Sequence, residues 1–182
     1  MNIVLRIAAI IFTMLFSLVY ITTRTIAPEY DFVYATEQVD SDVEVVFDDM
    51  AVPHIYANSE PDAMYALGYV HAMERLWQMD LLRRAGAGEL SALFGRDMIE
   101  NDKYLRSLGM RETAIRTVET LESTASPQVL EAMKAYLEGV NAFIETKELP
   151  FEYRLINAKP EPFKLRDVYC ATGFMAYSFA IH

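Results

Sequence analysis

Apolar and polar side chains alternate along two short stretches near residue 50. Residues 43–48 follow a period of two with one lapse, at Val46, and this pattern predicts a half-buried strand. A turn over residues 48–51 then leads into a second predicted strand over residues 52–57. Pro53 has no N–H to donate to a neighbouring strand, so it belongs at a strand start or a sheet edge. The pattern therefore predicts a strand pair.

A long helical pattern follows directly. Ser59 is a good N-terminal cap whose hydroxyl accepts from the backbone N–H of Asp62, while the Asp62 carboxylate reaches back to Ser59 in a capping box. Pro61 costs no hydrogen bond in the first helical turn. We expect the helix to run to about Arg84 and to end at the glycines of positions 86 and 88.

Large apolar residues lie on several sides of this helix, which indicates burial on several sides. One apolar stripe comprises Leu67, Val70, Trp77 and Leu81. Charged residues on such a helix need partners, because an unpaired buried charge is costly. Asp80 and Arg84 are four apart and are expected to pair, and Arg75 is expected to reach a carboxylate or carbonyl elsewhere. His71 and Arg75 form either a catalytic pair or part of a satisfied hydrogen-bond network. We favour the network, since no nucleophilic side chain lies at a spacing from these residues that is typical of a catalytic site.

The C-terminal half of the sequence continues in helices. Residues 98–121 have a charged helical pattern that Gly109 should break or bend. Ser126 then caps a helix, with Pro127 in its first turn, and helical spacing continues to about Thr146. Two long helical segments are therefore expected between the central helix and the last third of the chain.

Prolines punctuate the stretch that follows. Three of them lie between residues 150 and 162, which predicts an irregular surface segment, and the last helix should cover residues 165–180. The predicted fold class of this fragment is α+β, mostly helical with a few strands. Residues 27–42 are polar and acidic and are interpreted as a linker.

The N-terminus carries an apolar run from Ile7 to Ile21, with Arg6 before it and Arg24 after it. This pattern is typical of an export signal, although a small-residue cleavage site is absent. Residues 1–26 are therefore interpreted as a signal peptide or an uncleaved membrane anchor, in preference to a buried core helix. We expect an exported, periplasmic protein, or one anchored to the inner membrane through residues 7–21.

Composition excludes several classes of function. The formal net charge is −10, so the chain repels phosphate groups and nucleic-acid binding is not expected. Cys170 is the one cysteine, which rules out an intrachain disulfide, and we interpret it as a buried small apolar residue. His71 and Glu74 lack a second histidine at zinc spacing, so no metal site or cofactor is predicted in this fragment.

Three motifs follow one another along the chain. They are Ala51-Val52-Pro53-His54-Ile55, Gly68-Tyr69-Val70-His71-Ala72-Met73-Glu74-Arg75-Leu76-Trp77-Gln78-Met79, and Arg83-Arg84 through Gly95. In this order they resemble the motifs of the penicillin acylase family of N-terminal-nucleophile hydrolases, which includes penicillin acylases, cephalosporin acylases and acyl-homoserine-lactone acylases. Weaker similarities continue at Arg106–Gly109, Gly139–Asn141 and Pro160–Phe163. Residues 43–182 are accordingly interpreted as the α-chain portion of a penicillin-acylase-like domain, incomplete in this sequence.

The first motif departs from the family pattern in two places. Asp48-Asp49 stands where the family usually carries Arg-Asp, and Ala51 stands at the usual turn glycine. An alanine at a positive φ is strained. We therefore expect a slightly different turn at this position.

Membership in that family would place the catalytic machinery outside this chain. The resemblance implies an exported precursor that cuts itself into an α-chain, a spacer and a β-chain, whose N-terminal residue is the nucleophile and whose α-amine is the base. The complete enzyme would be a four-layer αββα sandwich and could carry calcium. This chain would then be an α-chain or a truncated reading frame, with no catalytic residue of its own and the β-chain as its partner.

Two residues of the last helix are candidate substrate-binding residues. Met175 and Phe179 match the family segment M-A-x-x-F, whose Met and Phe line the pocket for the acyl group of a small-molecule amide. They are four apart and share one helix face. A flexible Met beside an aromatic ring suits an apolar acyl group. Plain helix packing is the alternative.

Two functions are compatible with these observations. The first is the α-chain part of an exported amidohydrolase that releases an apolar acyl group from a β-lactam side chain, an N-acyl-homoserine lactone or another amide. The second is a non-catalytic, membrane-anchored helical binding module on the same scaffold. The coding region downstream of residue 182 discriminates them, because only the enzyme needs a spacer followed by Ser, Thr or Cys.

Overall fold

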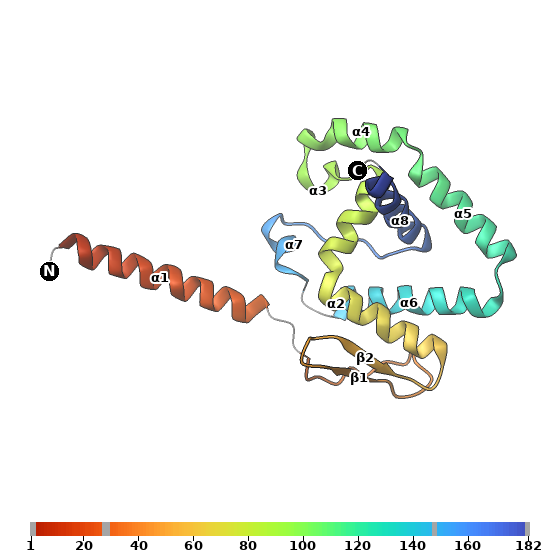
Figure 1. The fold of residues 1–182 in the computed structure, drawn as a ribbon, viewed down its shortest axis with the longest axis horizontal. Helices are drawn as coiled ribbons and strands as arrows, with labels where there is room; N and C mark the ends of the chain where they lie inside the picture. The colour runs from red at the N-terminus through yellow and green to blue at the C-terminus, as the bar shows by residue number, and fades with distance from the viewer. Residues whose placement is uncertain (1–2, 27–29, 147–148, 181–182) are drawn as a thin grey trace. The chain divides into compact units, whose positions relative to one another are not determined.

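The computed structural model describes residues 3–26, 30–146 and 149–180 and divides the chain into two compact units, Met1–Val33 and Tyr34–His182 (Figure 1). The first unit carries helix α1 (Ile3–Ile26), whose apolar side chains include the exposed Ile10, Phe12 and Leu15. Among the described helices, none combines the length and the apolar character needed to cross a bilayer. The predicted linker includes residues 27–29, which lie outside the described part of the chain.

The second unit is mostly helical with one small sheet, as expected (Figure 1). Its elements are β1 (Glu44–Phe47), β2 (Pro53–Tyr56), α2 (Glu60–Ala87), α3 (Ser91–Phe94), the 3-10 helix η1 (Arg96–Met98), α4 (Ile99–Ser107), α5 (Met110–Thr124), α6 (Pro127–Thr146), α7 (Phe151–Leu155) and α8 (Leu165–Ala180). Gly109 adopts a left-handed conformation between α4 and α5, which confirms the predicted break. Helix α7 was not predicted, because the stretch between its flanking prolines was expected to be irregular.

Strands β1 and β2 form the predicted pair, which is antiparallel, with Val46 opposite His54. The expected change of turn at Ala51 is wrong, because Ala51 keeps a φ of 59°. The Asp48 carboxylate holds this turn by accepting from the backbone N–H groups of Met50 and Val52, both at 2.9 Å. The bond from Val52 is the main reason that the pKa of Asp48 is lowered. The strain of one alanine, about 1–2 kcal/mol, is therefore offset by two hydrogen bonds to a carboxylate.

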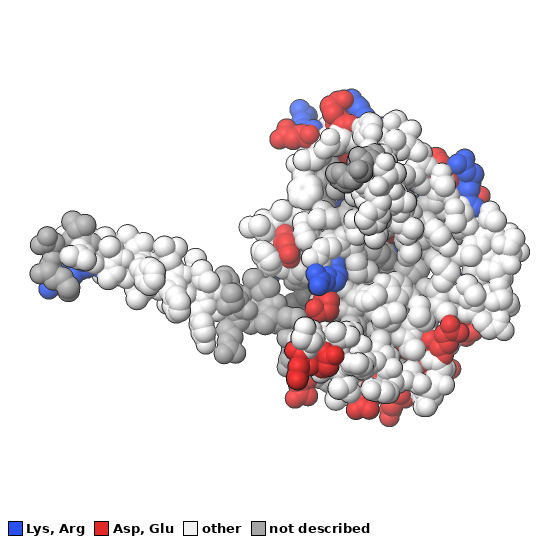
Figure 2. Space-filling view, viewed as in Figure 1, with Lys and Arg blue, Asp and Glu red and all other residues white. Residues whose placement is uncertain are grey.

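Negative charge is concentrated around this sheet. Residues 34–74 contain nine acidic residues and no Lys or Arg, in a chain whose net charge is −10. Figure 2 shows acidic side chains on the face displayed, several of them close together. The rest of the chain is therefore close to neutral.

Helix α2 begins as predicted, with the Ser59 hydroxyl accepting from the backbone N–H of Asp62 at 3.2 Å. The reciprocal half of the capping box is wrong. The Asp62 carboxylate accepts instead from the Asp40 N–H at 2.9 Å and from the Ser41 hydroxyl at 3.1 Å, and the Asp40 bond is the main cause that lowers the pKa of Asp62. Residues just before the sheet are thereby tied to α2. The helix ends at Gly88, which adopts a left-handed conformation.

The core lies where two helices cross α2. Helix α6 crosses its N-terminal half, and α8 packs against its C-terminal half (Figure 1). At the second crossing a Cβ on Gly86 would lie 2.0 Å from the carbonyl oxygen of Cys170. Cys170 is buried, as predicted, and burial raises the pKa of its thiol to about 11. Buried residues on several sides of α2 confirm the expectation drawn from its apolar positions.

Candidate functional site

Met175 and Phe179 lie one turn apart on α8. Their exposed fractions are 45% and 78%, so both side chains are exposed on the surface of the helix. The i, i+4 spacing places both on one face, as predicted. The structure therefore offers an apolar helix face at the C-terminal end of α8, and its role in binding an acyl group stays a prediction.

Tyr177 lies between these two residues in sequence and ties α8 to α4. Its hydroxyl is 2.7 Å from the hydroxyl of Tyr104, and the two rings meet edge to face. The hydrogen bond to Tyr104 is the main cause that raises the pKa of Tyr177. A single side-chain hydrogen bond thus anchors the C-terminal turns of the helix that carries Met175 and Phe179.

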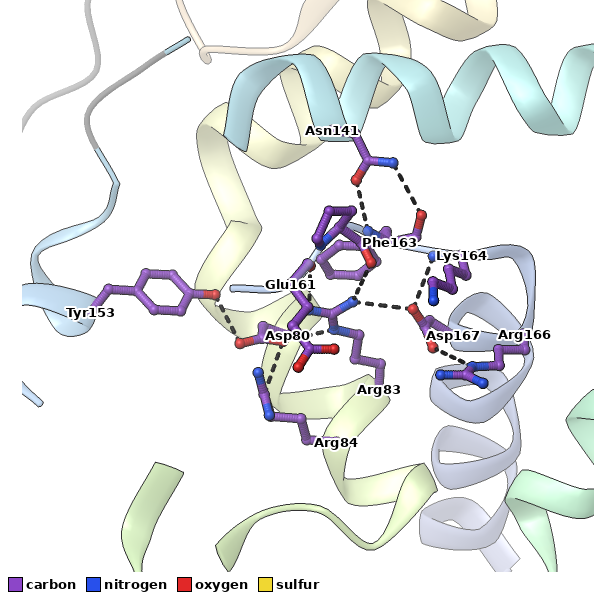
Figure 3. A network of polar contacts seen from close by, with 11 residues as sticks. Asp80, Arg83, Arg84, Asn141, Tyr153, Glu161, Phe163, Lys164, Arg166 and Asp167 are labelled. Atoms are coloured by element: carbon purple, nitrogen blue, oxygen red, sulfur yellow. Dashed lines mark hydrogen bonds and ion pairs between the residues drawn. The ribbon is translucent and has the colours of Figure 1, made fainter. Parts of the chain in front are cut away.

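A larger polar network fixes the N-terminal end of α8 (Figure 3). The Arg83 guanidinium donates through Nε to Asp80 Oδ1 at 2.7 Å and through Nη1 to Asp167 Oδ2 at 3.1 Å. It also donates to the carbonyl oxygens of Glu161 at 2.7 Å and Pro162 at 3.4 Å. Its Cζ atom stacks 3.8 Å from the centre of the Phe163 ring. One buried arginine of α2 therefore holds both α8 and the segment that leads into it.

Asn141 of α6 holds the same segment from the other side. Its amide donates to the carbonyl oxygen of Phe163 at 3.0 Å and accepts from the Phe163 N–H at 2.7 Å. Asp167 accepts from the backbone N–H of Lys164 at 2.9 Å and so caps the start of α8. Figure 3 shows Asn141 and Arg83 reaching this segment from different helices. The direction of α8 is set by side chains from α2 and α6.

Asp80 is the centre of the network and is completely buried. Its Oδ1 accepts from Nε of both Arg83 and Arg84, and its Oδ2 accepts from the Tyr153 hydroxyl at 3.0 Å. The predicted Asp80–Arg84 pair is confirmed at 3.1 Å. Burial, followed by the Asp80 charge, raises the pKa of Tyr153. The role of Arg83 was missed. The signal was present in the sequence, because two adjacent arginines on a buried helix need more than one carboxylate.

The network interpretation of His71 is confirmed and that of Arg75 is not. His71 Nδ1 lies 3.0 Å from the Tyr136 hydroxyl, which joins α2 to α6. Arg75 is exposed at a kink of α2, with φ −139° and ψ 15°, and makes no hydrogen bond within the described residues. Water solvates its charge, so the expected carboxylate or carbonyl partner is not required.

Metal ligands do not gather in this part of the molecule. Among the described residues, no group of three or more His, Cys, Asp or Glu side chains could hold a metal ion. The calcium that the resemblance implies for a complete enzyme therefore stays a prediction. What the described residues can do is to present and orient an apolar helix face.

Comparison with known proteins identifies the family that this chain resembles. The model of the family described as penicillin amidase matches residues 42–182. The penicillin acylase 2 proenzyme of Pseudomonas sp. strain SE83 is 42% identical over 123 residues, which cover 67% of this chain. An acyl-homoserine lactone acylase of Pseudomonas fluorescens is 34% identical over 69% of this chain, and the penicillin G acylase of Escherichia coli is 30% identical over 79%.

A solved structure shares the arrangement of the helices. The thermostable penicillin G acylase of Alcaligenes faecalis matches with a TM-score of 0.67 and 30% identity, over 78% of this chain and 75% of that chain. The curated relatives are much longer proteins, of whose length the matched part covers only 15% to 17%.

Proposed function

This chain belongs to the penicillin amidase family, and we propose that it is the helical, α-chain part of an exported amidohydrolase that releases an apolar acyl group. In this proposal the chain supplies one wall of the acyl-group pocket, and a companion β-chain supplies the nucleophile. The reaction requires a nucleophile, a base and an oxyanion hole. All three would belong to the companion chain.

One observation carries the proposal, namely that an exposed apolar pair sits on a firmly anchored helix. Met175 and Phe179 face away from this chain's core, while α8 is fixed through Arg83 and Asn141 at one end and through Tyr104 at the other. Burial of apolar area against an acyl group contributes about 25 cal/mol per Å². An anchored helix offers that area without first losing its own conformational freedom.

The small sheet and the exposed apolar side chains on it support the proposal of a companion chain. The sheet has two strands, and an isolated two-stranded sheet is of marginal stability. Val46, Val52 and Tyr56 are exposed on or beside it. We propose that these strands join a larger sheet of an αββα sandwich formed with the β-chain. One relative's name, a proenzyme, supports processing of a longer precursor.

Export is proposed from the N-terminal segment. Residues 7–21 are apolar and lie between Arg6 and Arg24, and this arrangement is typical of a segment that directs a protein across the inner membrane. The periplasm is then the compartment of the mature protein. The N-terminal residue of the mature α-chain, identified by mass spectrometry, tests this part of the proposal.

The proposed function is tested on the protein expressed from the full coding region. The mature companion chain should begin with Ser, Thr or Cys, and the complex should hydrolyse amides that carry apolar acyl groups of increasing size. Replacement of that first residue by alanine should abolish hydrolysis. A companion chain that is absent, or a complex that hydrolyses no member of an amide panel, would instead favour a non-catalytic binding module.

A further inference from the structure

Arg84 is a buried cation, and most of its N–H groups have no acceptor in the described part of the chain. Arg83 and Arg84 are both buried, with exposed fractions of 6% and 8%. Among the described residues, Arg83 donates four hydrogen bonds, whereas Arg84 donates one, from Nε to Asp80. A guanidinium has five N–H groups. Four of those on Arg84 therefore have no acceptor within the described residues.

The unused donors of Arg84 can be reached from outside. Some buried polar side-chain atoms have neither solvent contact nor a hydrogen-bond partner, and the Nη atoms of Arg84 are not among them. In Figure 3, Arg84 extends from α2 away from Arg83 and from Asp167, below Asp80. The small exposed part of Arg84 therefore includes nitrogen atoms that could meet an incoming acceptor.

Aromatic side chains lie beside this cation on the same side of α2. Trp77 is seven residues before Arg84, which places both on one helix face. Trp77 packs edge to face against Tyr153 of α7 at 5.0 Å and against Phe94 of α3 at 6.3 Å, and Phe94 is exposed. Tyr153 in turn donates to Asp80, the partner of Arg84. A partly exposed apolar surface thus lies on the same helix face as a cation with free donors.

We propose that Arg84 binds an Asp or Glu carboxylate of the companion chain, and that apolar residues next to that carboxylate pack on Trp77 and Phe94. The inference rests on the proposed function, because it takes the companion chain as the partner. A carboxylate fits best, since it accepts two parallel hydrogen bonds from the Nη groups and neutralises the charge. The relatives' greater length, of which this chain covers 15% to 17%, supplies the polypeptide from which such a segment could come.

The balance of charge supports a carboxylate in particular. In the part of the chain that the structure describes, Asp80 is shared between two arginines, and Arg83 has a second carboxylate in Asp167 whereas Arg84 has no second one. Desolvation of Arg84 by a partner is costly unless that partner pairs with it. A neutral surface placed over Arg84 would weaken the complex, whereas a carboxylate would both orient and strengthen it.

The test uses the processed complex obtained from the full coding region. Arg84→Lys keeps the charge but removes the planar fork, and it is compared with Arg83→Lys, whose bonds lie within this chain. The measured quantity is the rate at which the two chains separate in urea, followed by size exclusion. We expect Arg84→Lys to speed separation roughly tenfold or more, and Arg83→Lys to have the smaller effect on separation and the larger effect on thermal unfolding.

Equal separation rates for Arg84→Lys and the wild type would overturn the inference. If Arg84→Lys does not fold, the structure of the wild-type complex decides. A companion carboxylate oxygen within hydrogen-bond distance of an Arg84 Nη atom supports it, and water or backbone carbonyls alone at Arg84 reject it. An active complex without that carboxylate rejects this inference and leaves the proposed function standing, whereas the absence of any companion chain rejects both.

Discussion

Gly139 of α6 lies against the backbone of Tyr65 in α2, so closely that a Cβ on Gly139 would be 1.9 Å from the Tyr65 carbonyl oxygen. Gly68 of α2 faces the Tyr136 carbonyl oxygen of α6 at the same distance. Two glycines, one on each helix, therefore let the two backbones touch. This crossing fixes α6, and α6 in turn carries Asn141, which holds the segment leading to α8.

Replacement of Gly139 by alanine should separate the two helices. The added methyl group meets backbone atoms, which cannot move aside as a side chain can, and overpacking of this kind costs about 1–3 kcal/mol or more. Gly139→Ala is therefore expected to lower the free energy of unfolding of the assembled protein by at least that amount. Thermal or urea unfolding measures it.

Gly173→Ala is the matched control for that variant. A Cβ on Gly173 would lie 3.6 Å from the flexible side chain of Met110, an ordinary contact. Alanine favours a helix over glycine by about 1 kcal/mol, so Gly173→Ala should be neutral or stabilising. Equal losses of stability in both variants would contradict the close crossing.

The stability of the protein should fall in mild acid because of His71. Partial burial lowers the pKa of His71 below its usual 6.5. The unfolded chain then takes up a proton first as pH falls, so the stabilisation is complete above about pH 6.5 and is lost as pH falls through the lower, folded pKa. Urea unfolding at a series of pH values should show this loss, and His71→Gln should reduce it. An unchanged pH dependence in His71→Gln would be incompatible with this assignment.

Asn141 should affect substrate binding without touching substrate. Asn141→Ala removes both hydrogen bonds to Phe163 and leaves its backbone groups without those partners, at a cost of about 1–3 kcal/mol. Because α8 is then less well positioned, KM for amides with apolar acyl groups should rise more than kcat falls. Asn141→Asp retains the bond from the Phe163 N–H and should show an intermediate effect. A fall in kcat at constant KM would argue against a positioning role.

Phe179 should matter for substrate but not for folding. Its exposed fraction is 78%, equal to that of Leu155 on α7, and truncation of an exposed side chain changes stability by about 0.5 kcal/mol or less. Phe179→Ala should raise KM for an apolar acyl group roughly tenfold, whereas Leu155→Ala should leave KM unchanged. Steady-state kinetics of the assembled protein compares the two variants. Equal KM values for both would remove Phe179 from the pocket.

Local rules in the sequence predicted the long elements well. Helices α2, α6 and α8 followed from helical spacing together with caps such as Ser59 and Ser126, both of which accept the expected backbone hydrogen bonds. The hairpin followed from a period of two. Helix α7 was missed because five residues after Pro150 are too few to show a helical period. The conformation of Ala51 was missed because it depends on two bonds to Asp48.

Contacts between distant residues could not be read from spacing. The Asp80–Arg84 pair is local and was predicted, but Arg83 reaches Asp167, 84 residues further along the chain. That contact exists only because α8 returns to α2 at Gly86. Met175 and Phe179 could be placed on one helix face in advance, because their spacing is local. The network that orients this face joins distant residues, so it could be found only from the structure.

The most direct measurement compares amide hydrolysis by the purified 182-residue chain with hydrolysis by the complete processed protein at equal molar concentration. A chain that supplies pocket and scaffold only should release no acyl group alone and should aggregate, while the complete protein turns over. Measurable turnover by the 182-residue chain, abolished by a substitution within it, would contradict the assignment of catalysis to a companion chain.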